Sequence, residues 1–382
     1  MASRLYRTTR QLFVAVEAAL LRLQLDTLGT PTLAALLALA VTGLILLEAR
    51  PTQTRVARHL PARCHDALGR LLREMPWSTR ALMALLCAFA KRLGRDGYLV
   101  LDDVIVEKAF AKRLRWASKI YSFAKKRKVW GIHIVVLLWC SCDGRWRIPV
   151  GFRLWRPKRS CRKERYQTKL QLAVKLVGVV VASDLRVQYI VGDTHYTAGW
   201  FTKRLARLGL TWHGTLDPKT SVVWRGKKQA VRALTEMLHL KWRQHLGLRA
   251  LALRVYAPKY GQIRLVVTRN RHGNYEYLVS NDLQADLTTM VVRKRSRWSV
   301  ETVFRDSKQF TGLQACQCWV DQAMVRHVSL VLLTFVVLQL LRTTPDESVG
   351  AVKERWQLAV LRDGEVAPPP LRACPPELRP TA

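Results

Sequence analysis

The chain has 382 residues, and its 64 Lys and Arg outnumber 27 Asp and Glu, which gives a formal net charge of +37. Hydrophobic residues make up 49% of the chain, enough for a large buried core, so the composition excludes a globally disordered polypeptide. The cationic excess excludes an ordinary metabolic enzyme and predicts a polyanionic partner. Nucleic acid is the first candidate, because binding it releases condensed counterions, and an anionic membrane surface is the second.

Residues 1–95 carry helical periodicity only, and they predict an all-α N-terminal domain that binds DNA. Within this part, residues 33–47 are apolar apart from Thr42, but the stretch is shorter than the roughly 20 residues that cross a bilayer. Residues 328–341 form a second apolar stretch that is also too short and is interrupted by polar residues. We therefore expect buried helices here. A membrane-associated basic protein that uses residues 33–47 is the alternative.

From Tyr98 the pattern changes to short apolar runs that alternate with helical periodicity. The runs on either side of Asp143-Gly144 predict a hairpin, and the run before Gly192-Asp193 predicts a buried strand that ends at the aspartate. This alternation predicts an α/β domain with a central mixed sheet. The expected strands are 98–104, 130–140, 145–155, 185–191 and 210–216, and the expected helices are 164–183 and 198–208.

A long stretch of β-like runs follows, and two long helices are expected after it, at 286–310 and 321–342. Turn residues at Gly261 and Gly273 predict hairpin tips within the β-like stretch. We expect its strands to pair with each other and not with the central sheet. The predicted division is a helical domain at 1–95, an α/β domain at 96–220 and 285–345, a β-rich insertion at 221–284, and a C-terminal helix with a Pro-rich tail at 346–382.

Three carboxylates are conspicuous, because acidic residues are scarce in this chain. Asp102 lies in the first predicted strand, Asp193 ends a later strand, and Glu301 lies on a predicted helix. Carboxylate oxygens bind Mg²⁺, and two such ions about 3.5–4 Å apart can activate an attacking oxygen and stabilise the leaving one in phosphodiester chemistry. The alternatives are structural: Glu301 forms a salt bridge with Arg297 or Arg305, and the aspartates are strand-end turn residues.

The spacing of the charged residues around Glu301 also matches a known sequence signature. At 100° per residue, Glu301 shares one helix face with three cations. The set resembles the Y-x2-R-x3-E-x6-K signature of the DDE transposases of bacterial insertion sequences, in the branch with a β-rich insertion before the Glu. Arg297, Glu301 and Lys308 fit this signature. Trp298 follows the Arg as it often does in the family, whereas Lys294 replaces the usual Tyr.

Both strand-end aspartates also resemble the family pattern, which covers residues 33–342. Leu101-Asp102-Asp103 is similar to the family's first-Asp strand, and Gly192-Asp193-Thr-His-Tyr196 is similar to the end of its second. Side chains alternate along a strand, so only one of Asp102 and Asp103 can face a common site. The family pattern selects Asp102, and Asp103 is then expected to be a hydrogen-bonding neighbour.

The resemblance implies a ribonuclease H-like mixed sheet and a transposase that cuts transposon ends and joins them to target DNA. It implies that Asp102, Asp193 and Glu301 bind two Mg²⁺ ions, for which Mn²⁺ can substitute. The implied partners are double-stranded DNA, as terminal inverted repeats and target, and a second copy of the chain, with no membrane. The implied location is the bacterial cytoplasm, at the nucleoid. Because Lys294 replaces the Tyr, the resemblance does not decide whether a DNA hairpin intermediate forms. The rival function is a catalytically inactive, transposase-derived DNA-binding protein.

Two basic segments add to the DNA prediction. Between Lys108 and Lys128 there are nine Lys or Arg and no acid, with Trp116, Tyr121 and Phe123 interleaved. A second segment, 153–169, has eight cations and one acid. Cations beside aromatic residues favour contact with phosphates and bases, although a solvated cationic face is the alternative. The predicted DNA-binding residues are Lys125, Lys126, Arg127, Lys128, Lys294, Arg297, Trp298, Arg305 and Lys308, and in the insertion Lys227, Lys228, Arg264 and Arg269.

The eight cysteines do not form a dense disulfide framework. Cys140 and Cys142, like Cys316 and Cys318, are separated by one residue, where zinc sites prefer two to four. Reduced and mostly buried thiols are therefore expected, with a structural zinc as the alternative. This cysteine usage is in keeping with a reducing cytoplasm.

Overall fold

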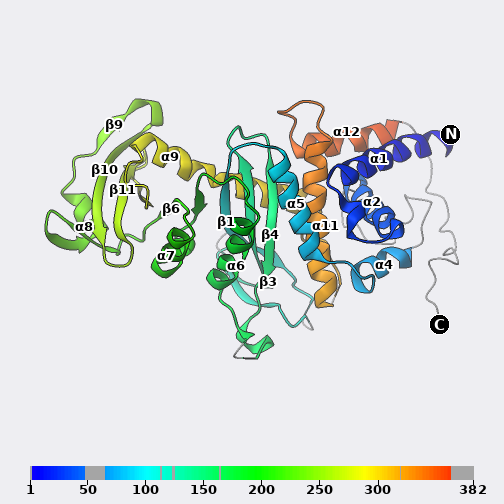
Figure 1. The fold of residues 1–382 in the computed structure, drawn as a ribbon, viewed down its shortest axis with the longest axis horizontal. Helices are drawn as coiled ribbons and strands as arrows, with labels where there is room; N and C mark the ends of the chain where they lie inside the picture. Colours follow the sequence, from blue (N-terminus) through cyan, green and yellow to red (C-terminus); the bar gives the residue numbers. More distant parts are fainter. Residues whose placement is uncertain are drawn as a thin grey trace.

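The computed structural model describes residues 2–47, 65–111, 114–122, 125–162, 165–318 and 320–362. The expected Pro-rich tail at 363–382 lies outside these residues, as do Cys64 and Cys374. The chain forms a helical bundle at one end, a central sheet covered by helices on both faces, and a β-rich extension at the other end (Figure 1). The six described cysteines are free thiols.

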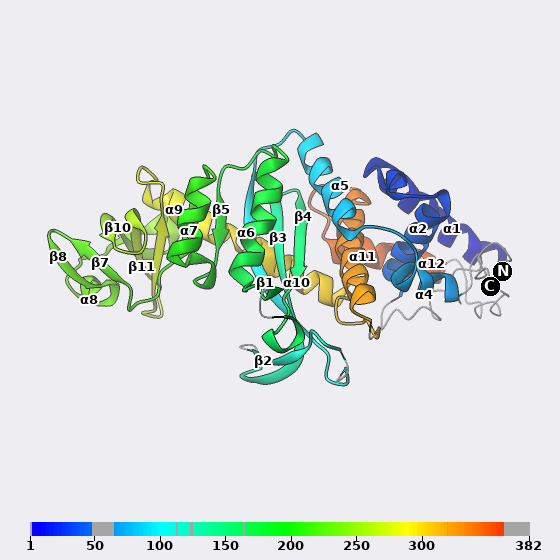
Figure 2. The same cartoon turned by 60° about the horizontal axis from the view of Figure 1, so that its bottom comes forward.

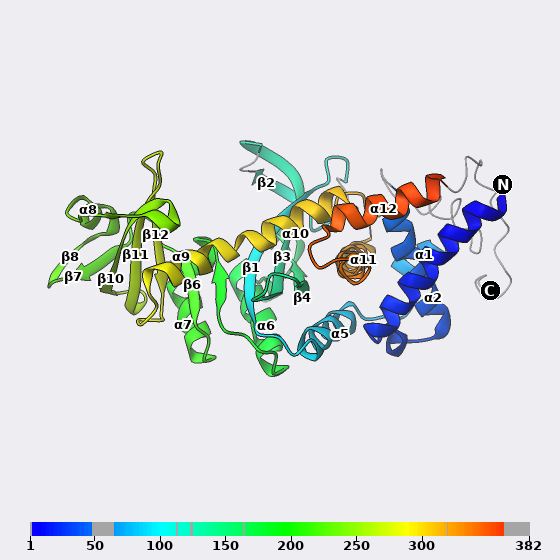
Figure 3. The same cartoon turned by 90° about the horizontal axis from the view of Figure 1, so that it is seen from above.

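Helices from both ends of the chain build the bundle. The first group is α1 (Ala2–Arg22), α2 (Pro31–Leu46), α4 (His65–Arg73) and α5 (Thr79–Arg92). The Thr30 side chain accepts the Leu33 N–H at 3.3 Å and so caps α2, with Pro31 in its first turn. The second group, α11 (Asp321–Leu340) and α12 (Val349–Arg362), packs against α1 and α2 (Figure 3).

The apolar helices of the bundle are buried in the protein. Residues 33–45 of α2 include a long run of side chains with little or no exposure, as the short apolar stretch predicts. The second apolar stretch belongs to a longer helix, since α11 begins at Asp321. Of the helices that the structure describes, α11 alone is long and apolar enough to cross a membrane, and 89% of its apolar window is buried inside the fold.

Arg326 of α11 joins the two groups of helices. Its guanidinium is buried and donates to the carbonyl oxygens of Leu72 at 3.2 Å and Trp77 at 3.3 Å, and also to Met75. These carbonyls follow the last turn of α4 or belong to it, so Arg326 satisfies acceptors that the helix leaves unpaired. Its cationic centre also lies 5.2 Å from the ring centre of Trp77.

Replacement of Arg326 by Met is expected to lower the free energy of unfolding by about 3 kcal/mol, because several buried carbonyls lose their donor. Equilibrium unfolding in urea measures the change. Arg362→Met, at an exposed position at the end of α12, is the control and should alter the free energy by less than about 0.5 kcal/mol. Equal losses in the two variants would contradict a bracing role for Arg326.

The central sheet is formed by strands close to those expected. β1 (Gly97–Glu107) pairs antiparallel with β3 (Arg127–Ser141) and parallel with β5 (Ile190–Gly192). The other strands are β2 (Ser118–Ser122) and β4 (Arg147–Leu154), which pair with β3, and β6 (Trp212–Thr215), which pairs with β5. β5 is shorter than the predicted strand, which was expected to begin at residue 185.

Helices cover the two faces of this sheet. α6 (Lys169–Ala182) and α7 (Gly199–Arg207) lie on one face, and α9 (Leu287–Ser296) and α10 (Trp298–Gln309) lie on the other (Figure 3). α6 begins later than predicted because Thr168 and Gln171 form a capping box, which fixes the first turn at Lys169.

The helix predicted at 286–310 is interrupted at Arg297. The N–H of Arg297 bonds to the Lys294 carbonyl at 3.2 Å, and the Arg297 carbonyl accepts the N–H of Val300 at 3.1 Å. These tighter turns separate α9 from α10, while both helices continue in nearly the same direction (Figure 3). The prediction of one continuous helix is therefore wrong, and Arg297 occupies the junction.

The β-rich extension contains strands, as the β-like runs predict. Its hairpin turns include Gly261 and Gly273, both at positive φ. The longest strands are β10 (Leu248–Ala257) and β11 (Gly261–Arg269), and β11 pairs with β12 (Tyr275–Ser280). The remaining elements are β7 (Ser221–Trp224), β8 (Lys227–Ala230), α8 (Val231–Glu236) and β9 (Lys241–Arg243).

The extension is continuous with the central sheet. β10 and β11 do not pair with β1, as expected, but β12 pairs antiparallel with β6 from Leu278 opposite Thr215 to Ser280 opposite His213. The expectation that strands of 221–284 pair only with each other is therefore wrong at this edge. The result is one mixed sheet of 12 strands in an α/β protein with a helical N-terminal part, in keeping with a ribonuclease H-like fold and an insertion.

Candidate active site

β1 presents Asp102 and Asp103 to opposite faces of the sheet, because side chains alternate along a strand. Asp102 lies on the side of α9 and α10, where its Oδ2 accepts a hydrogen bond from the Arg297 guanidinium at 2.9 Å. Asp103 lies on the side of α6, where its carboxylate binds Lys169 and His133, each at 2.8 Å. The structure therefore places Asp102, and not Asp103, beside the helix that carries Glu301.

Arg297 brings two of the predicted carboxylates together. One guanidinium nitrogen binds Asp102 and another binds the Oε1 of Glu301, four residues further along the helix. The side chains of Arg297 and Asp102 are 19% and 15% exposed, so this ion pair is shielded from water, whereas Glu301 is 34% exposed. The salt bridge between Glu301 and Arg297 that we considered as a structural alternative is thus present, but the same arginine also reaches a strand 195 residues away.

Asp193 lies next to this cluster, directly after β5, the parallel neighbour of β1. Its Oδ1 accepts the N–H of Tyr196 at 3.1 Å, which fixes the turn after the strand. Burial and the negative charge of Asp193 together raise the pKa of Asp102 to about 7. Burial is the larger cause, and the contribution of Asp193 indicates that the two carboxylates are near each other, because the effect of one charge on another falls with distance.

The chemistry of these donors fits a hard divalent cation, since carboxylate oxygens are the ligands that Mg²⁺ and Mn²⁺ prefer. A metal-ready cluster is not formed, however: within the described ranges, no three His, Cys, Asp or Glu side chains are grouped closely enough to hold an ion. The Arg297 guanidinium instead supplies the positive charge between Asp102 and Glu301.

The other residues predicted to bind DNA on α9 and α10 lie at different distances from the carboxylates. Burial lowers the pKa of Lys294, and Arg297 lowers it further, while the charges of Asp193 and Glu301 oppose the shift, so Lys294 lies near the same cluster. Further along the chain, Trp298 is 64% exposed, and Arg305 pairs with Asp306 at 3.1 Å. Lys308 borders a cavity of about 670 Å³ together with Glu107, at the end of β1.

The predicted basic segment at 125–128 lies at the turn between β2 and β3, which projects from the sheet (Figure 2). Lys125, Lys126, Arg127 and Lys128 are all exposed. Lys125 pairs with Glu107 at 2.8 Å, so part of its charge is already compensated. Phe123, which we expected among these cations, lies outside the described residues.

Two tyrosines that the sequence did not single out hold the helix junction against the sheet. Tyr98 of β1 and Tyr189, just before β5, stack with ring centres 5.0 Å apart and an interplanar angle of 2°. The Tyr98 hydroxyl lies 3.0 Å from that of Ser299, and the Tyr189 hydroxyl donates to Ser296 at 3.2 Å. These serines flank Arg297, so the stacked pair sets where its guanidinium sits.

Removal of either tyrosine hydroxyl is expected to destabilise the protein by about 1 kcal/mol, since its serine partner loses a hydrogen bond in a partly buried place. Tyr98→Phe and Tyr189→Phe keep the stacked rings, and urea unfolding measures the loss. Tyr256→Phe, on β10 with a side chain that is 45% exposed, is the control and should behave like the unmodified protein. If all three variants unfold alike, the hydroxyls do not anchor the junction.

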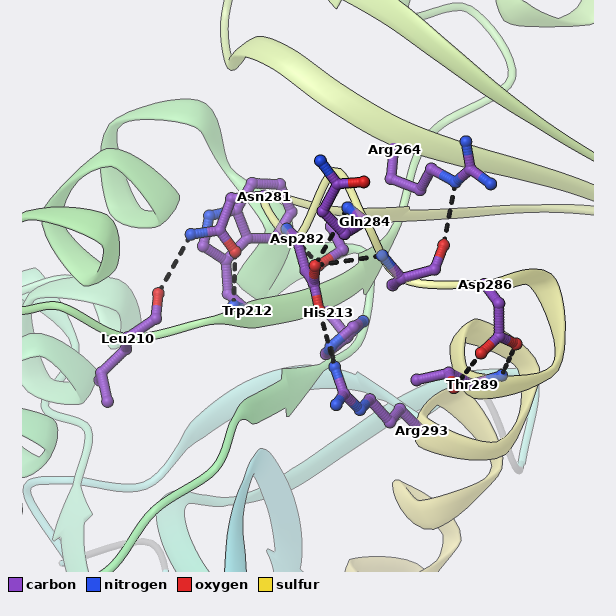
Figure 4. Close-up of polar contacts among 12 residues, drawn as sticks. Leu210, Trp212, His213, Arg264, Asn281, Asp282, Gln284, Asp286, Thr289 and Arg293 are labelled. Atoms are coloured by element: carbon purple, nitrogen blue, oxygen red, sulfur yellow. Dashed lines mark hydrogen bonds and ion pairs between the residues drawn. The ribbon is translucent and has the colours of Figure 1, made fainter.

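A second polar network ties the end of the β-rich extension to α9 (Figure 4). Arg293 of α9 donates to the Nε2 of His213 at 3.0 Å and to Asp282 at 3.2 Å. Burial, reinforced by the charge of Arg293, lowers the pKa of His213 to about 3, so the ring is a neutral acceptor at physiological pH. Asp286 caps α9 by accepting the Thr289 N–H at 2.8 Å.

Residues of the extension that we predicted to face DNA are placed differently from one another. Arg264 is half-buried and donates to the Ala285 carbonyl at 3.0 Å, so it braces the loop before α9 (Figure 4). Lys227, Lys228 and Arg269 are exposed. Arg264 therefore has a structural partner that the sequence did not show, and the other three remain available to a ligand.

More than half of the chain matches the model of a known protein family. A family model described as DDE superfamily endonuclease matches residues 25–236, a range that contains Asp102 and Asp193 and ends before Glu301. None of the curated proteins matches the chain.

Proposed function

Because the chain belongs to the DDE superfamily of endonucleases, we propose that it is a DNA transposase that cuts transposon ends and joins them to target DNA. The proposed catalytic residues are Asp102, Asp193 and Glu301. The supporting observation is that Arg297 binds both Glu301 and Asp102, which is 195 residues before Arg297, with Asp193 at the end of the neighbouring strand. Two of the chain's 27 acidic residues thus share one largely buried arginine, and the third proposed residue raises the pKa of Asp102 by its negative charge.

The same three residues are proposed to hold two Mg²⁺ ions, for which Mn²⁺ can substitute. When bound, such ions supply Lewis acidity, which makes water a nucleophile and stabilises the leaving oxygen. The chain contributes the carboxylate oxygens from two adjacent strands and one helix. Asp102 must be ionised to serve as a ligand, and its raised pKa means that cation binding displaces a proton from it below about pH 7.

The cations around the carboxylates are proposed to position the DNA strand. Arg297 and Lys294 lie at the cluster, where a guanidinium or ammonium group can bind phosphate oxygens. Lys308 and the exposed segment Lys125–Lys128 extend this positive surface beyond the end of β1. Trp298 and Arg305 lie on the same helix and complete the proposed DNA-binding set.

The wider proposal concerns partners and place. We propose that the DNA substrates are terminal inverted repeats and target DNA, and that two copies of the chain pair two transposon ends. The proposed location is the bacterial cytoplasm, at the nucleoid, without a membrane partner. The division at residues 95, 220, 284 and 345 is also retained as a proposal, with the all-α part as a DNA-binding domain.

A strand-cleavage assay with the full-length protein tests this function. Supercoiled DNA that carries the inverted repeats flanking the coding region should be nicked at the repeat ends with Mg²⁺ or Mn²⁺, and EDTA should abolish the reaction. Binding of the repeats without nicking in either metal would instead support the rival function, an inactive transposase-derived DNA-binding protein.

A further inference from the structure

A cavity of about 500 Å³ opens on the face of the sheet opposite Arg297, between the first turn of α6 and the start of α7. Its walls carry Trp155, which follows β4, Tyr166, which precedes α6, and Trp200, in the first turn of α7. Its volume falls in the range of small-molecule sites, about 300–1,000 Å³. The cavity lies near the carboxyl ends of β1 and β5, where open α/β sheets bind ligands.

The aromatic walls are held in defined orientations and remain accessible. Trp155 and Tyr166 pack edge to face with ring centres 6.5 Å apart, and His133 packs edge to face on Trp155 at 5.7 Å. Trp200 is 49% exposed, so its ring can be reached from the solvent. Aromatic rings from three separate segments thus surround a space that a flat ring system can enter.

The lining of the cavity also includes polar side chains, among them His133, Lys169 and His195, and the first two of these bind Asp103. Lys169 donates to both oxygens of Asp103, at 2.8 and 3.0 Å, and the Nδ1 of His133 lies 2.8 Å from the same carboxylate. The Tyr196 hydroxyl adds a further hydrogen bond to Asp103 at 3.1 Å. Asp103 is therefore charge-compensated, and the imidazole of His195 leaves a donor or acceptor in the lining that suits the polar edge of a base.

A cation lies beside the aromatic wall of the cavity, and more follow in the same segment. Lys158 lies with its Nζ 5.3 Å from the ring centre of Tyr166, at the edge of the aromatic wall. Arg162 and Arg165 of the same segment are also exposed, whereas Arg156 and Arg159 lie over the rings of Trp116 and Trp130. An aromatic wall beside cationic side chains matches a ligand with a flat heterocycle and a phosphate.

We propose that this cavity receives an unpaired nucleotide of a DNA strand, with its base against Trp155, Tyr166 and Trp200 and its phosphate at Lys158. The inference rests on the proposed function, since it assigns the site to the DNA on which the endonuclease acts. Asp102 and Asp103 are adjacent, so the cavity and the carboxylate cluster lie on opposite sides of the same strand. A nucleotide displaced from a duplex at the sheet edge has a receiving site there.

Equilibrium binding of two probes to the full-length protein tests this site. The probes are a fluorescein-labelled oligothymidylate strand and a blunt duplex of the same length. Trp200→Ala is expected to weaken binding of the single strand about tenfold relative to the duplex, because one base loses its stacking partner. Trp242→Ala is the matched control: Trp242 on β9 is 48% exposed, against 49% for Trp200, and this variant should keep the wild-type ratio.

Photocrosslinking identifies the contact directly and does not depend on a variant folding. A single strand that carries 5-iododeoxyuridine should crosslink to peptides that contain Trp155, Tyr166 or Trp200, and an excess of free thymidine monophosphate should not compete. Crosslinks found only elsewhere, or equal losses in the Trp200 and Trp242 variants, would overturn the proposal. Efficient competition by the free mononucleotide would overturn the assignment to a DNA strand.

These outcomes are separable from those of the cleavage assay. Metal-dependent nicking by the unmodified protein, with crosslinks away from the cavity, would leave the proposed function standing and remove the nucleotide site. Absence of nicking, with crosslinks in the cavity, would remove the transposase proposal and leave a single-strand binding site.

Discussion

Replacement of Glu301 by Gln is expected to reduce DNA strand cleavage about a thousandfold or more, while binding of the DNA ends changes by less than about twofold. The amide keeps the shape of the side chain but removes an anionic oxygen donor and most of its attraction for a divalent cation. The cationic surface around the cluster is unchanged, which is why binding should survive. A gel-based cleavage assay and an anisotropy titration on one protein preparation measure the two effects.

Glu301→Gln also removes one of the two ion pairs of Arg297, so its effect on folding has to be separated from its effect on chemistry. Arg297 keeps Asp102 as a partner at 2.9 Å, and the fold should therefore persist. Urea unfolding of the variant checks this. Glu354→Gln, at an exposed position on α12, is the matched control and should cleave like the unmodified protein. Wild-type cleavage by Glu301→Gln would remove Glu301 from the active site.

The affinity for duplex DNA is expected to fall by about 10³ to 10⁵ between roughly 50 and 200 mM salt, if about six to ten phosphates are contacted. The physical reason is that each neutralised phosphate releases condensed counterions, and added salt opposes that release. Titrations at several salt concentrations give the slope. An affinity that does not change over this range would contradict a cationic DNA surface.

Variants of the turn between β2 and β3 test whether this turn contributes to the salt dependence of DNA binding. Lys126→Gln and Lys128→Gln should each reduce the slope by about one, because both side chains are exposed. Lys125→Gln should reduce it less, since Lys125 already pairs with Glu107 at 2.8 Å. If all three variants keep the slope of the unmodified protein, this turn does not contact phosphates.

The order of the elements could be predicted from the sequence because it depends on local patterns. The apolar run after Gly97 forms β1, and the runs beside Asp143-Gly144 form an antiparallel hairpin. Most of the apolar residues 33–47 belong to the buried helix α2. The β-like runs and the turn residues Gly261 and Gly273 also indicated the insertion before Glu301. In each case the signal lies within a few residues of the feature that it predicts.

The contacts that build the candidate site could not be predicted in the same way. The pair of Arg297 with Glu301 follows from helix spacing, but the second partner of Arg297, Asp102, depends on how α10 packs on the sheet. Asp103 finds Lys169 and Tyr196 on other elements, and neither residue carries a local sign of this contact. Tertiary packing decides which side chains on different elements meet, and local periodicity carries no information about it.

The ladder between β6 and β12 has a consequence for how the chain can be shortened. Removal of 221–284 would leave Trp212–Thr215 as an open edge, with unpaired N–H and C=O groups in the middle of the molecule. Such an edge recruits strands from other chains, so the truncated protein would be prone to self-association. The inserted residues thus protect the edge of the central sheet, and a shortened protein would have to keep β12 or replace the pairing that β12 gives to β6.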